Sequence, residues 1–485
     1  MAEDLKTKTA KGIGWGFADN VLGLGITAVA NVVLARILSP SDFGIIGMTA
    51  IFMTLSTSLV DSGFTDALTR KKDAVKSDFD TVFYFNLTVS CLLYAVLFLC
   101  APFIAGFFGK EILVPIVRIL GLSLIINAFG IVQKIILVRR IDFKTQAWIS
   151  LASSVAASVA AVVAAFYGLG VWSLVILQVA KFAVNTVLLW SVSKWHPGLC
   201  FSRKSFKDMF SFGGRLLITS IISILWSEMY SIIIGKMYSS SVLGQYSRAD
   251  KVKNMVTSNV SSVMKKVSYP VLASIQDEGD RQVNVYRKVL KTTVLISFTA
   301  VFGVWAVAGP FILTVFGDQW LPAVGYLRIM CFSGLFLPLM MCSANIINAD
   351  GRSDITLFLE ILKAVMGLIP VIFGIMFSVE ALLWSMVGVS FLLFIVHAAC
   401  VSKVIRYSVG RQLRDILPSL CISVVMALIV NAMNMLDMPL WLLLILQICA
   451  GALVVIPAYE FVYKSAEYSD IKSELLSLIN KIRGK

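Results

Sequence analysis

Long apolar runs dominate the chain, and short segments rich in Gly, Pro and charged residues separate them. About 20 apolar residues form a helix long enough to cross roughly 30 Å of bilayer hydrocarbon, so each run predicts a membrane-spanning helix. The expected spans lie near residues 13–37, 43–63, 81–108, 112–138, 145–167, 170–193, 211–237, 242–269, 292–316, 323–347, 354–376, 379–402, 413–434 and 439–463. The pattern therefore predicts an all-α integral membrane protein with 14 transmembrane helices.

Lysine and arginine gather in every second loop between these runs. The basic clusters fall within 6–11, 70–76, 139–144, 194–207, 265–291 and 403–414, whereas Lys110 is the clear exception among the opposite loops. Because short basic loops stay on the cytoplasmic side, the alternation predicts that both termini are cytoplasmic. It also supports an even number of spans independently of hydropathy.

The C-terminal tail carries an apolar helical stripe, which consists of Ile471, Leu475, Leu478, Ile479 and Ile482. With lysine and arginine on the remaining positions, this pattern is typical of an amphipathic helix on the anionic cytoplasmic leaflet. A solvated tail is the alternative interpretation.

Composition supports the membrane class and excludes several others. Of the 485 residues 58% are hydrophobic and 14% charged, whereas a soluble domain carries roughly 25% charged residues. The net charge of +14 follows the loops and forms no basic stripe, so nucleic acid is not an expected partner. The eight cysteines lack CxxC spacing, and neither His196 nor His397 has a metal-ligand neighbour, so no metal site is predicted.

Catalytic motifs are nearly absent from the sequence. Ser262 and Lys265 fit SxxK, but the companion motifs of serine acyl-enzymes do not follow. The chain has no P-loop. We therefore expect a protein that is not an enzyme and needs no cofactor. A proton or sodium gradient is the energy source that we consider for it.

A weak internal repeat occurs at an offset of about 200 to 212 residues. The segments 38–44 and 238–244 correspond, as do Phe108–Gly109 and Phe316–Gly317. Arg118 and Arg328 fall at matching positions, as do the Trp–Ser pairs at 172 and 384. Six spans in each repeat, an even number, predict parallel repeats about an axis along the membrane normal.

The repeat also predicts the domain organisation. Spans one to six form an N-terminal lobe at 1–193, and spans seven to twelve form a C-terminal lobe at 194–402. Two further spans occupy 403–464, and a cytoplasmic amphipathic tail occupies 465–485.

Ionisable side chains inside the spans mark the candidate functional residues, because a charge in hydrocarbon costs at least about 2.5 kcal/mol and usually faces a cavity or a partner. The candidates for binding substrate are Asp19, Asn20, Arg36, Arg118, Arg215, Arg248, Lys251 and Arg328. Arg248 and Lys251 lie three residues apart and so share a helix face. They either line water and bind an anionic ligand, or are neutralised by acids such as Asp19, Asp61 and Glu228.

Asp61 and Glu228 are also the candidates for binding a coupling ion, since a membrane-embedded carboxylate can hold a proton or sodium. Glu360 and Lys363 have opposite charge and i,i+3 spacing, which favours mutual neutralisation.

Two segments carry a resemblance to a known family. Residues 34–44 read LARILSPSDFG and are followed by Asp61, Gly63 and Phe64, while residues 243–249 read LGQYSRA and Tyr269–Pro270 ends the same helix. These motifs resemble the polysaccharide transporter family, specifically Wzx-type flippases of the colanic-acid-exporter-like branch. That group belongs to the multidrug/oligosaccharidyl-lipid/polysaccharide exporter superfamily.

The resemblance implies two pseudosymmetric six-helix lobes around a central cationic cavity, with two C-terminal helices outside them. It implies a bacterial inner-membrane flippase that moves a polyprenyl-pyrophosphate-linked oligosaccharide outward by alternating access, as a capsule, exopolysaccharide or O-antigen repeat unit. Membrane lipids and the polymerase and export machinery of the same pathway are the implied partners. From the similar lipid II flippase it also implies that Asp19, Arg36, Arg248 and Lys251 meet the pyrophosphate, although Asn20 here replaces an arginine of that pattern.

Two rival functions remain at this point. A multidrug or cation antiporter of the same superfamily would have an apolar, acidic cavity, which the excess of basic residues near Arg248 disfavours. A membrane-embedded glycan polymerase or glycosyltransferase would use the same lipid carrier, but the predicted outer loops are too short for an acceptor-binding domain.

Overall fold

The structure is a computed structural model that describes residues 15, 22–61, 64–71, 73–198, 200–276, 278–463, 467–469, 472–474 and 477. All regular elements in these ranges are helices. Eleven helical segments of the described chain are long and apolar enough to cross a membrane, and Leu22–Ile37 is a shorter apolar helix. The protein is therefore an all-α, multi-pass membrane protein. The predicted apolar stripe of the tail lies outside the described residues.

The chain forms two compact units, residues 1–244 and 245–485, and we describe each by itself. The boundary between them falls inside one continuous helix, α9 (Ser240–Ala273). It differs from the lobe boundary at 193/194 that the repeat suggests. The compact units are defined by packing and the lobes by repetition, so the division into lobes stays a prediction.

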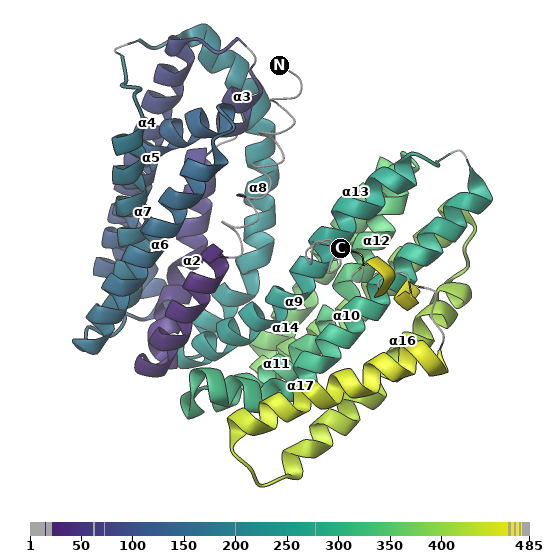
Figure 1. The fold of residues 1–485 in the computed structure, drawn as a ribbon. Coiled ribbons are helices and arrows are strands. Elements are labelled where there is room, and N and C mark those ends of the chain that lie inside the picture. The colour runs from purple at the N-terminus through teal and green to yellow at the C-terminus, as the bar shows by residue number, and fades with distance from the viewer. Residues whose placement is uncertain are drawn as a thin grey trace. The chain divides into compact units, whose positions relative to one another are not determined.

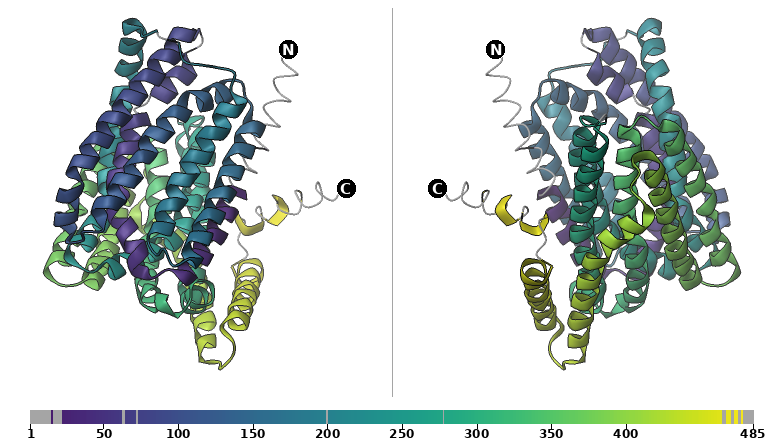
Figure 2. Two further views of the ribbon diagram at one scale, coloured as in Figure 1. Left: turned by 90° about the vertical axis from the view of Figure 1, so that its left-hand side faces the viewer. Right: turned by 90° about the vertical axis from the view of Figure 1, so that its right-hand side faces the viewer.

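The first unit is a helical bundle (Figure 1). It comprises the helix Leu22–Ile37 followed by α2 (Pro40–Asp61), α3 (Phe64–Arg70), α4 (Lys76–Phe108), α5 (Leu113–Arg139), α6 (Phe143–Phe166), α7 (Trp172–Val192) and α8 (Arg203–Met237). Helix α5 packs against both α4 and α7, and α6 packs along α7 (Figure 2). Helix α8 packs on α2, α3 and α4 and so completes this bundle.

The segment between α7 and α8 is fastened to the start of α4. The backbone N–H of Gly198 donates to Asp80 at 3.1 Å, and that of Ser202 donates to the Thr81 hydroxyl at 3.0 Å. Trp195 makes an edge-to-face contact with Phe83 at a centroid distance of 5.7 Å. These contacts explain why α8 remains with the first unit, although the repeat assigns it to the second half of the sequence.

Two glycines allow the starts of α2 and α9 to touch. A methyl group added to Gly44 would lie 1.7 Å from the carbonyl oxygen of Ser240, and one added to Gly244 would lie 1.9 Å from that of Pro40. The Ser41 and Ser240 hydroxyls are hydrogen-bonded at 2.7 Å. Only glycine permits backbones to approach so closely. The two corresponding segments, 38–44 and 238–244, are therefore in direct contact within the first unit.

The second unit contains the rest of α9 and a second set of helices. They are α10 (Gly279–Phe316), the short η1 (Asp318–Trp320), α11 (Leu321–Gly334), α12 (Phe336–Ala349), α13 (Ser353–Met366), α14 (Leu368–Met376), α15 (Val379–Ile405), α16 (Val409–Ala432), η2 (Met433–Met435), α17 (Leu440–Pro457) and η3 (Ala458–Val462). Helix α4 ends at Phe108 before Gly109, and α10 ends at Phe316 before Gly317. Both glycines have positive φ, so this part of the repeat has a structural counterpart.

Two of the expected spans are interrupted helices. The span at 323–347 is divided at Leu335 into α11 and α12, and the span at 354–376 is divided at Gly367 into α13 and α14. A proline lies four residues after the last residue of the preceding helix in each case, Pro338 after Gly334 and Pro370 after Met366. Proline lacks an N–H and its ring collides with the carbonyl four residues earlier, which accounts for both interruptions.

Helices α16 and α17 form a hairpin that is attached to α10 (Figure 2). Asp415 of α16 accepts two hydrogen bonds from Arg287 of α10, at 2.5 and 2.7 Å, and a further bond from the Tyr407 hydroxyl. Lys291 lies 3.6 Å from the same carboxylate. Burial and the bond to Asp415 raise the pKa of Tyr407 above its ordinary value, so this tyrosine stays a neutral donor at physiological pH.

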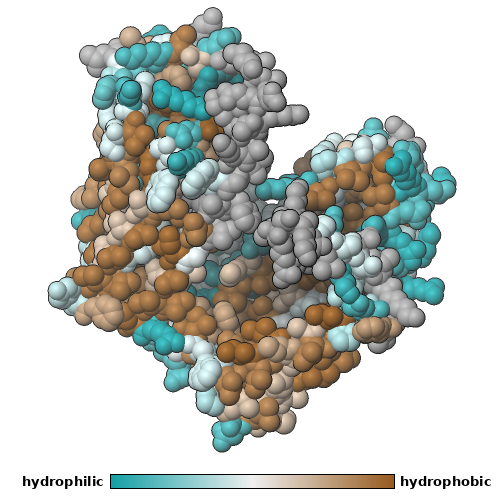
Figure 3. All heavy atoms as spheres, in the orientation of Figure 1, coloured by the Kyte–Doolittle hydropathy of each residue, from teal (hydrophilic) through white to brown (hydrophobic). Residues whose placement is uncertain are grey.

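Large apolar side chains cover the outer faces of the helices, as expected for surfaces in contact with lipid. Phe103 of α4 is 80% exposed and Leu453 of α17 is 73% exposed. Figure 3 shows apolar residues over the middle of the first unit, with hydrophilic residues gathered towards the end that carries α3. This distribution reverses that of a water-soluble bundle.

Candidate functional site

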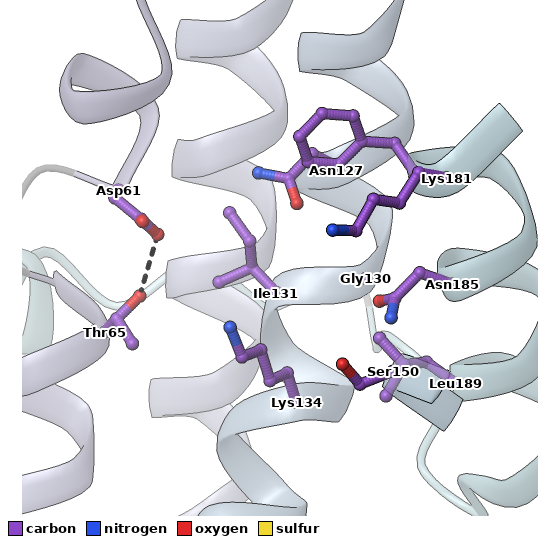
Figure 4. A pocket seen from close by; sticks show the side chains of 11 residues that line it. Asp61, Thr65, Asn127, Gly130, Ile131, Lys134, Ser150, Lys181, Asn185 and Leu189 are labelled. Atoms are coloured by element: carbon purple, nitrogen blue, oxygen red, sulfur yellow. Dashed lines mark hydrogen bonds between the residues drawn. The ribbon is translucent and has the colours of Figure 1, made fainter. Parts of the chain in front are cut away.

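A cavity of about 390 Å³ lies within the first unit, between the helices of its bundle (Figure 4). Its lining comes from the end of α2 and from α3, α5, α6 and α7, and consists of Asp61, Thr65, Asn127, Gly130, Ile131, Lys134, Ser150, Lys181, Phe182, Asn185 and Leu189. The volume is within the range of roughly 300 to 1,000 Å³ that is usual for small-ligand sites. We refer to this cavity as the basic pocket.

Close packing of α5 on α7 shapes one wall of the basic pocket. A methyl group on Gly130 would lie 3.0 Å from the Thr186 hydroxyl, so the glycine permits a tight approach of the two helices. Thr186 donates to the carbonyl of Ile126 at 2.9 Å, and the Trp190 indole donates to that of Phe129 at 2.9 Å. These bonds fix the register in which Lys134 and Asn127 of α5 face Lys181 and its neighbours on α7.

The lining is polar and has more positive than negative charge. Figure 4 shows the ammonium groups of Lys134 and Lys181 directed into the space between their helices, with Asn127, Ser150 and Asn185 around them. Asp61 lies at the opposite rim and accepts a hydrogen bond from Thr65 at 3.3 Å. With two lysines and one carboxylate, the basic pocket suits an anion better than a cation.

A second cavity of the first unit has the opposite character. It is an open groove of about 570 Å³ between Leu22–Ile37 and α6, lined almost entirely by apolar residues such as Leu22, Val29 and Val159. Its lining cannot bind a charged group, so the groove is part of the hydrocarbon-facing surface.

The arginine on α9 that the sequence singles out is buried in the second unit. Arg248 is 5% exposed, and its guanidinium carbon lies 4.5 Å from the ring centre of Phe316 and 4.6 Å from that of Trp320. One turn earlier, Gln245 donates to the carbonyl of Gln319 at 2.7 Å. Lys251, by contrast, is exposed, so the two cations share a helix face but differ in environment.

The matched arginines of the repeat also contact neighbouring helices. Arg118 of α5 lies over the ring of Phe98 of α4, 4.1 Å from its centre. Arg328 of α11 donates to the Asn431 side chain of α16 at 3.0 Å. The sequence positions correspond, but each arginine bonds within its own unit.

The remaining candidates are only partly described. Arg36 is exposed near the end of Leu22–Ile37, and Glu228 is half-buried on α8. Asp19 and Asn20 lie outside the described residues, and of Arg215 the structure describes the helix but not the side chain. The roles assigned to these residues stay predictions.

Two further comparisons with the sequence analysis are clear. Lys363 and Glu360 form an ion pair at 2.7 Å, which confirms their predicted mutual neutralisation. Neither Lys181 nor Lys134 was among the predicted site residues, although each is a lysine inside an apolar run. In the sequence Lys134 lies close to a basic loop and so resembles a lysine at the membrane interface, and only the packing of α5 on α7 reveals the pocket. Within the described chain, no cluster of three His, Cys, Asp or Glu residues could hold a metal ion.

Apolar helices of membrane length around a charged internal pocket define a polytopic membrane protein of the transporter type. The family described as polysaccharide biosynthesis protein matches residues 33–325, more than half of the chain. The protein therefore belongs to this family, which confirms the resemblance drawn from 34–44 and 243–249.

Three curated relatives are similar over most of their length. The teichuronic acid biosynthesis protein TuaB of Bacillus subtilis (strain 168) is 27% identical over 428 residues, which cover 86% of this chain and 87% of that protein. The succinoglycan biosynthesis transport protein ExoT of Rhizobium meliloti (strain 1021) is 26% identical and covers 81% and 82% respectively. The lipopolysaccharide biosynthesis protein WzxC of Escherichia coli (strain K12) is 24% identical, with 76% of each chain covered.

Solved structures share the fold. The lipid II flippase MurJ in an inward closed conformation matches with a TM-score of 0.73 at 13% identity, covering 94% of this chain and 99% of that chain. An inward-facing multidrug resistance MATE family transporter of the MOP superfamily matches with a TM-score of 0.61 at 14% identity, covering 79% and 98%. These likenesses establish the fold and carry no information on substrate.

Proposed function

We propose that this protein is a flippase that carries a polyprenyl-pyrophosphate-linked oligosaccharide from the cytoplasmic to the outer face of a bacterial inner membrane. The observation that carries the proposal is membership of the polysaccharide biosynthesis family over residues 33–325. The relatives are named for biosynthesis or transport of teichuronic acid, succinoglycan and lipopolysaccharide. A charged, water-soluble headgroup cannot cross hydrocarbon unaided, so a lipid-linked glycan precursor needs a transporter of this kind.

The proposal includes a topology of 14 spans with both termini in the cytoplasm. The structure supplies eleven apolar helices of sufficient length, and Leu22–Ile37, α8 and α9 are the three further candidates. Helices α8 and α9 carry many polar residues, as expected of helices that line water. Two six-helix lobes around a central cavity, with α16 and α17 appended, would then follow the repeat.

In this mechanism the saccharide headgroup crosses in a hydrated path while the polyprenyl chain stays in lipid. Basic side chains replace the water around the anionic headgroup, and alternation of two conformations exposes the path first to one side and then to the other. A carrier of this kind needs a gradient or removal of its product for net flow. A proton or sodium gradient is our proposed drive, and Glu228 is the preferred carboxylate because Asp61 shares its pocket with two lysines.

The gradient proposal is checked by measuring transport before and after the gradient is collapsed, for the wild type and for Glu228→Gln. Full gradient dependence in the variant would remove Glu228 from this role.

The multidrug antiporter is the second candidate, since a MATE family transporter shares the fold. Its expected cargo is cationic, and the lining of the basic pocket disfavours a cation. The third candidate is a glycan polymerase or glycosyltransferase of the same pathway. A transporter acts without chemistry on its cargo, so the two classes differ in which lipid-linked intermediate accumulates when the protein is missing.

The decisive experiment is deletion of the gene in its native host, followed by complementation. We expect surface polysaccharide to disappear and single lipid-linked repeat units to accumulate where a membrane-impermeant glycosidase applied to intact spheroplasts cannot reach them. Accumulation of repeat units on the outer face would indicate a polymerase. Normal polysaccharide with altered drug sensitivity would indicate an antiporter and would refute the flippase.

A further inference from the structure

Lys134 and Lys181 make no ion pair within the described residues, in contrast to Lys253 and Lys363. Lys253 pairs with Asp250 and Lys363 pairs with Glu360, each at 2.7 Å and each three residues apart. Neither Lys134 nor Lys181 makes a hydrogen bond or an ion pair within the described residues, and neither has an acidic residue three or four positions away on its helix. The fold therefore brings two lysines and a single carboxylate, that of Asp61, to one cavity.

Lys181 and Lys134 are both exposed in the cavity, so their ammonium groups are open to a ligand. Lys181 is the tenth of the 21 residues of α7, so it lies at the middle of that apolar helix. A lysine at mid-depth is expensive in the membrane and usually serves a functional site. Lys134 lies five residues before the end of α5, and its side chain also lines the basic pocket (Figure 4).

The other lining groups suit an anion with several oxygen atoms. The amides of Asn127 and Asn185 and the hydroxyl of Ser150 supply neutral donors beside the two ammonium groups. The Asn185 amide is already oriented, because it donates to the Ser153 hydroxyl at 3.4 Å. Lysine binds such groups as a point charge, without the fixed fork of arginine, so the site accepts carboxylate and phosphate alike.

We propose that the basic pocket, through Lys134 and Lys181, binds an anionic group of the transported headgroup, either the carboxylate of an acidic sugar or a phosphate of the lipid linkage. The identity of the cargo as a headgroup depends on the proposed function, whereas binding of the anion does not. The site lies wholly within the first unit, whereas Arg248 belongs to the second.

The first test measures binding at the two lysines directly. The full-length protein in lipid nanodiscs is acetylated with acetic anhydride in sodium glucuronate or sodium pyrophosphate, and in glucose plus sodium chloride at matched ionic strength. Mass spectrometry then gives the acetylation rate of each lysine. At about twice its dissociation constant, an anion should slow Lys134 and Lys181 by about threefold. Lys110, which is exposed outside the pocket, is the internal control.

The two sources of the anion are distinguished by which probe protects. Protection by glucuronate assigns the pocket to an acidic sugar, and protection by pyrophosphate assigns it to the lipid linkage. Equal rates in both anions and in the control solution overturn the proposal.

The second test measures export in cells with the charge removed. The double variant Lys134→Gln/Lys181→Gln should reduce polysaccharide export by about tenfold or more at normal membrane abundance. The double variant to Arg, which retains both charges, should export at least several times more than the glutamine variant, and Lys110→Gln should match the wild type. Normal export by the glutamine variant refutes the transport role of the pocket while leaving the flippase intact. If export does not depend on the wild-type protein at all, the proposed function fails, and the acetylation rates alone decide whether the pocket binds anions.

Discussion

Arg248 and Lys251 show how neighbouring charges on one helix can have different tasks. The guanidinium of Arg248 lies against Phe316 and Trp320 in the interior of the second unit, where it joins α9 to the segment before α11. Lys251 is one turn away and exposed. Contact with two rings stabilises a buried arginine through cation–π attraction. Its first role is thus to hold α9 in place, and Lys251 is the better placed of the two to meet a ligand.

We therefore expect Arg248→Ala to lower stability and Lys251→Gln to leave it unchanged. Two desolvated cation–π contacts are worth roughly 2 to 4 kcal/mol, so the alanine variant should show a lower melting temperature in detergent and less protein in the membrane. Lys251→Gln should keep its melting temperature and lose export.

Thermal melting and export measured on both variants check this pair. An alanine variant that melts like the wild type but exports nothing would contradict the structural role of Arg248. It would favour direct binding instead.

At the level of residues, the sequence identifies which charges are unusual but not what they touch. Glu360 and Lys363 are neutralised as predicted because both partners lie on one helix. The burial of Arg248 could not be predicted from the sequence, because the rings that cover its guanidinium belong to Phe316 and Trp320, which are far away along the chain. That Lys134 and Lys181 line one cavity could not be predicted either, because it depends on the register of α5 on α7. Gly130 and Thr186 set this register by a contact between the two helices.

Among the helices, the contact between α2 and α9 is the most sensitive to substitution. The methyl groups of Gly44→Ala and Gly244→Ala would overlap the carbonyl oxygens of Ser240 and Pro40, which are backbone atoms and cannot rotate away. Each variant should lose about 3 kcal/mol, the upper part of the usual range for overpacking, and the double variant should not be additive because both act on one contact.

Melting temperatures of the three variants measure these losses. Gly106→Ala on α4 is the matched control, since its added methyl group would meet no atom within 4 Å, and it should melt at or slightly above the wild-type temperature. Equal melting of Gly44→Ala and Gly106→Ala would show that the helix starts are not in contact.

The elements themselves follow closely from the sequence, apart from their interruptions. The length of each apolar run and the charged segments that separate the runs are sufficient to predict the apolar helices. The spans expected at 323–347 and 354–376 are each one apolar segment of membrane length, within which the single residues Leu335 and Gly367 separate two helices. Pro338 and Pro370 follow these two residues. A proline inside an apolar run is ambiguous on its own, because Pro102 and Pro310 lie within α4 and α10 without dividing them.

For the whole molecule, orientation in the membrane is the main prediction. With both termini cytoplasmic, a cysteine replacing Asp318 after α10 should react with a membrane-impermeant maleimide added to intact cells, and one replacing Lys194 after α7 should react only after lysis. Both positions are exposed, so neither result depends on burial. The wild type with its native cysteines gives the background. Labelling of the Lys194 position in intact cells would invert the topology.

The division of the whole chain into two lobes stays a prediction, because packing and repetition describe different properties. Repetition in the sequence places α8 with the second half, whereas the bonds from Gly198 and Ser202 to α4 hold its start in the first unit. A repeat records the order in which elements occur. It does not record which neighbour each element packs against, and that depends on contacts that a single sequence does not display.

The glycine contact has a consequence for the origin of the chain. Pro40 meets Gly244 while Ser240 meets Gly44, and the members of each corresponding pair are 200 positions apart. When residue i of one segment touches residue j of another and j touches i in return, a local two-fold axis relates the two segments, here the starts of α2 and α9. The two helix starts thus make the contact that two identical half-length chains would make in a dimer. A gene duplication that joined such chains would inherit this interface ready-made, and it would need glycine at both positions from the outset.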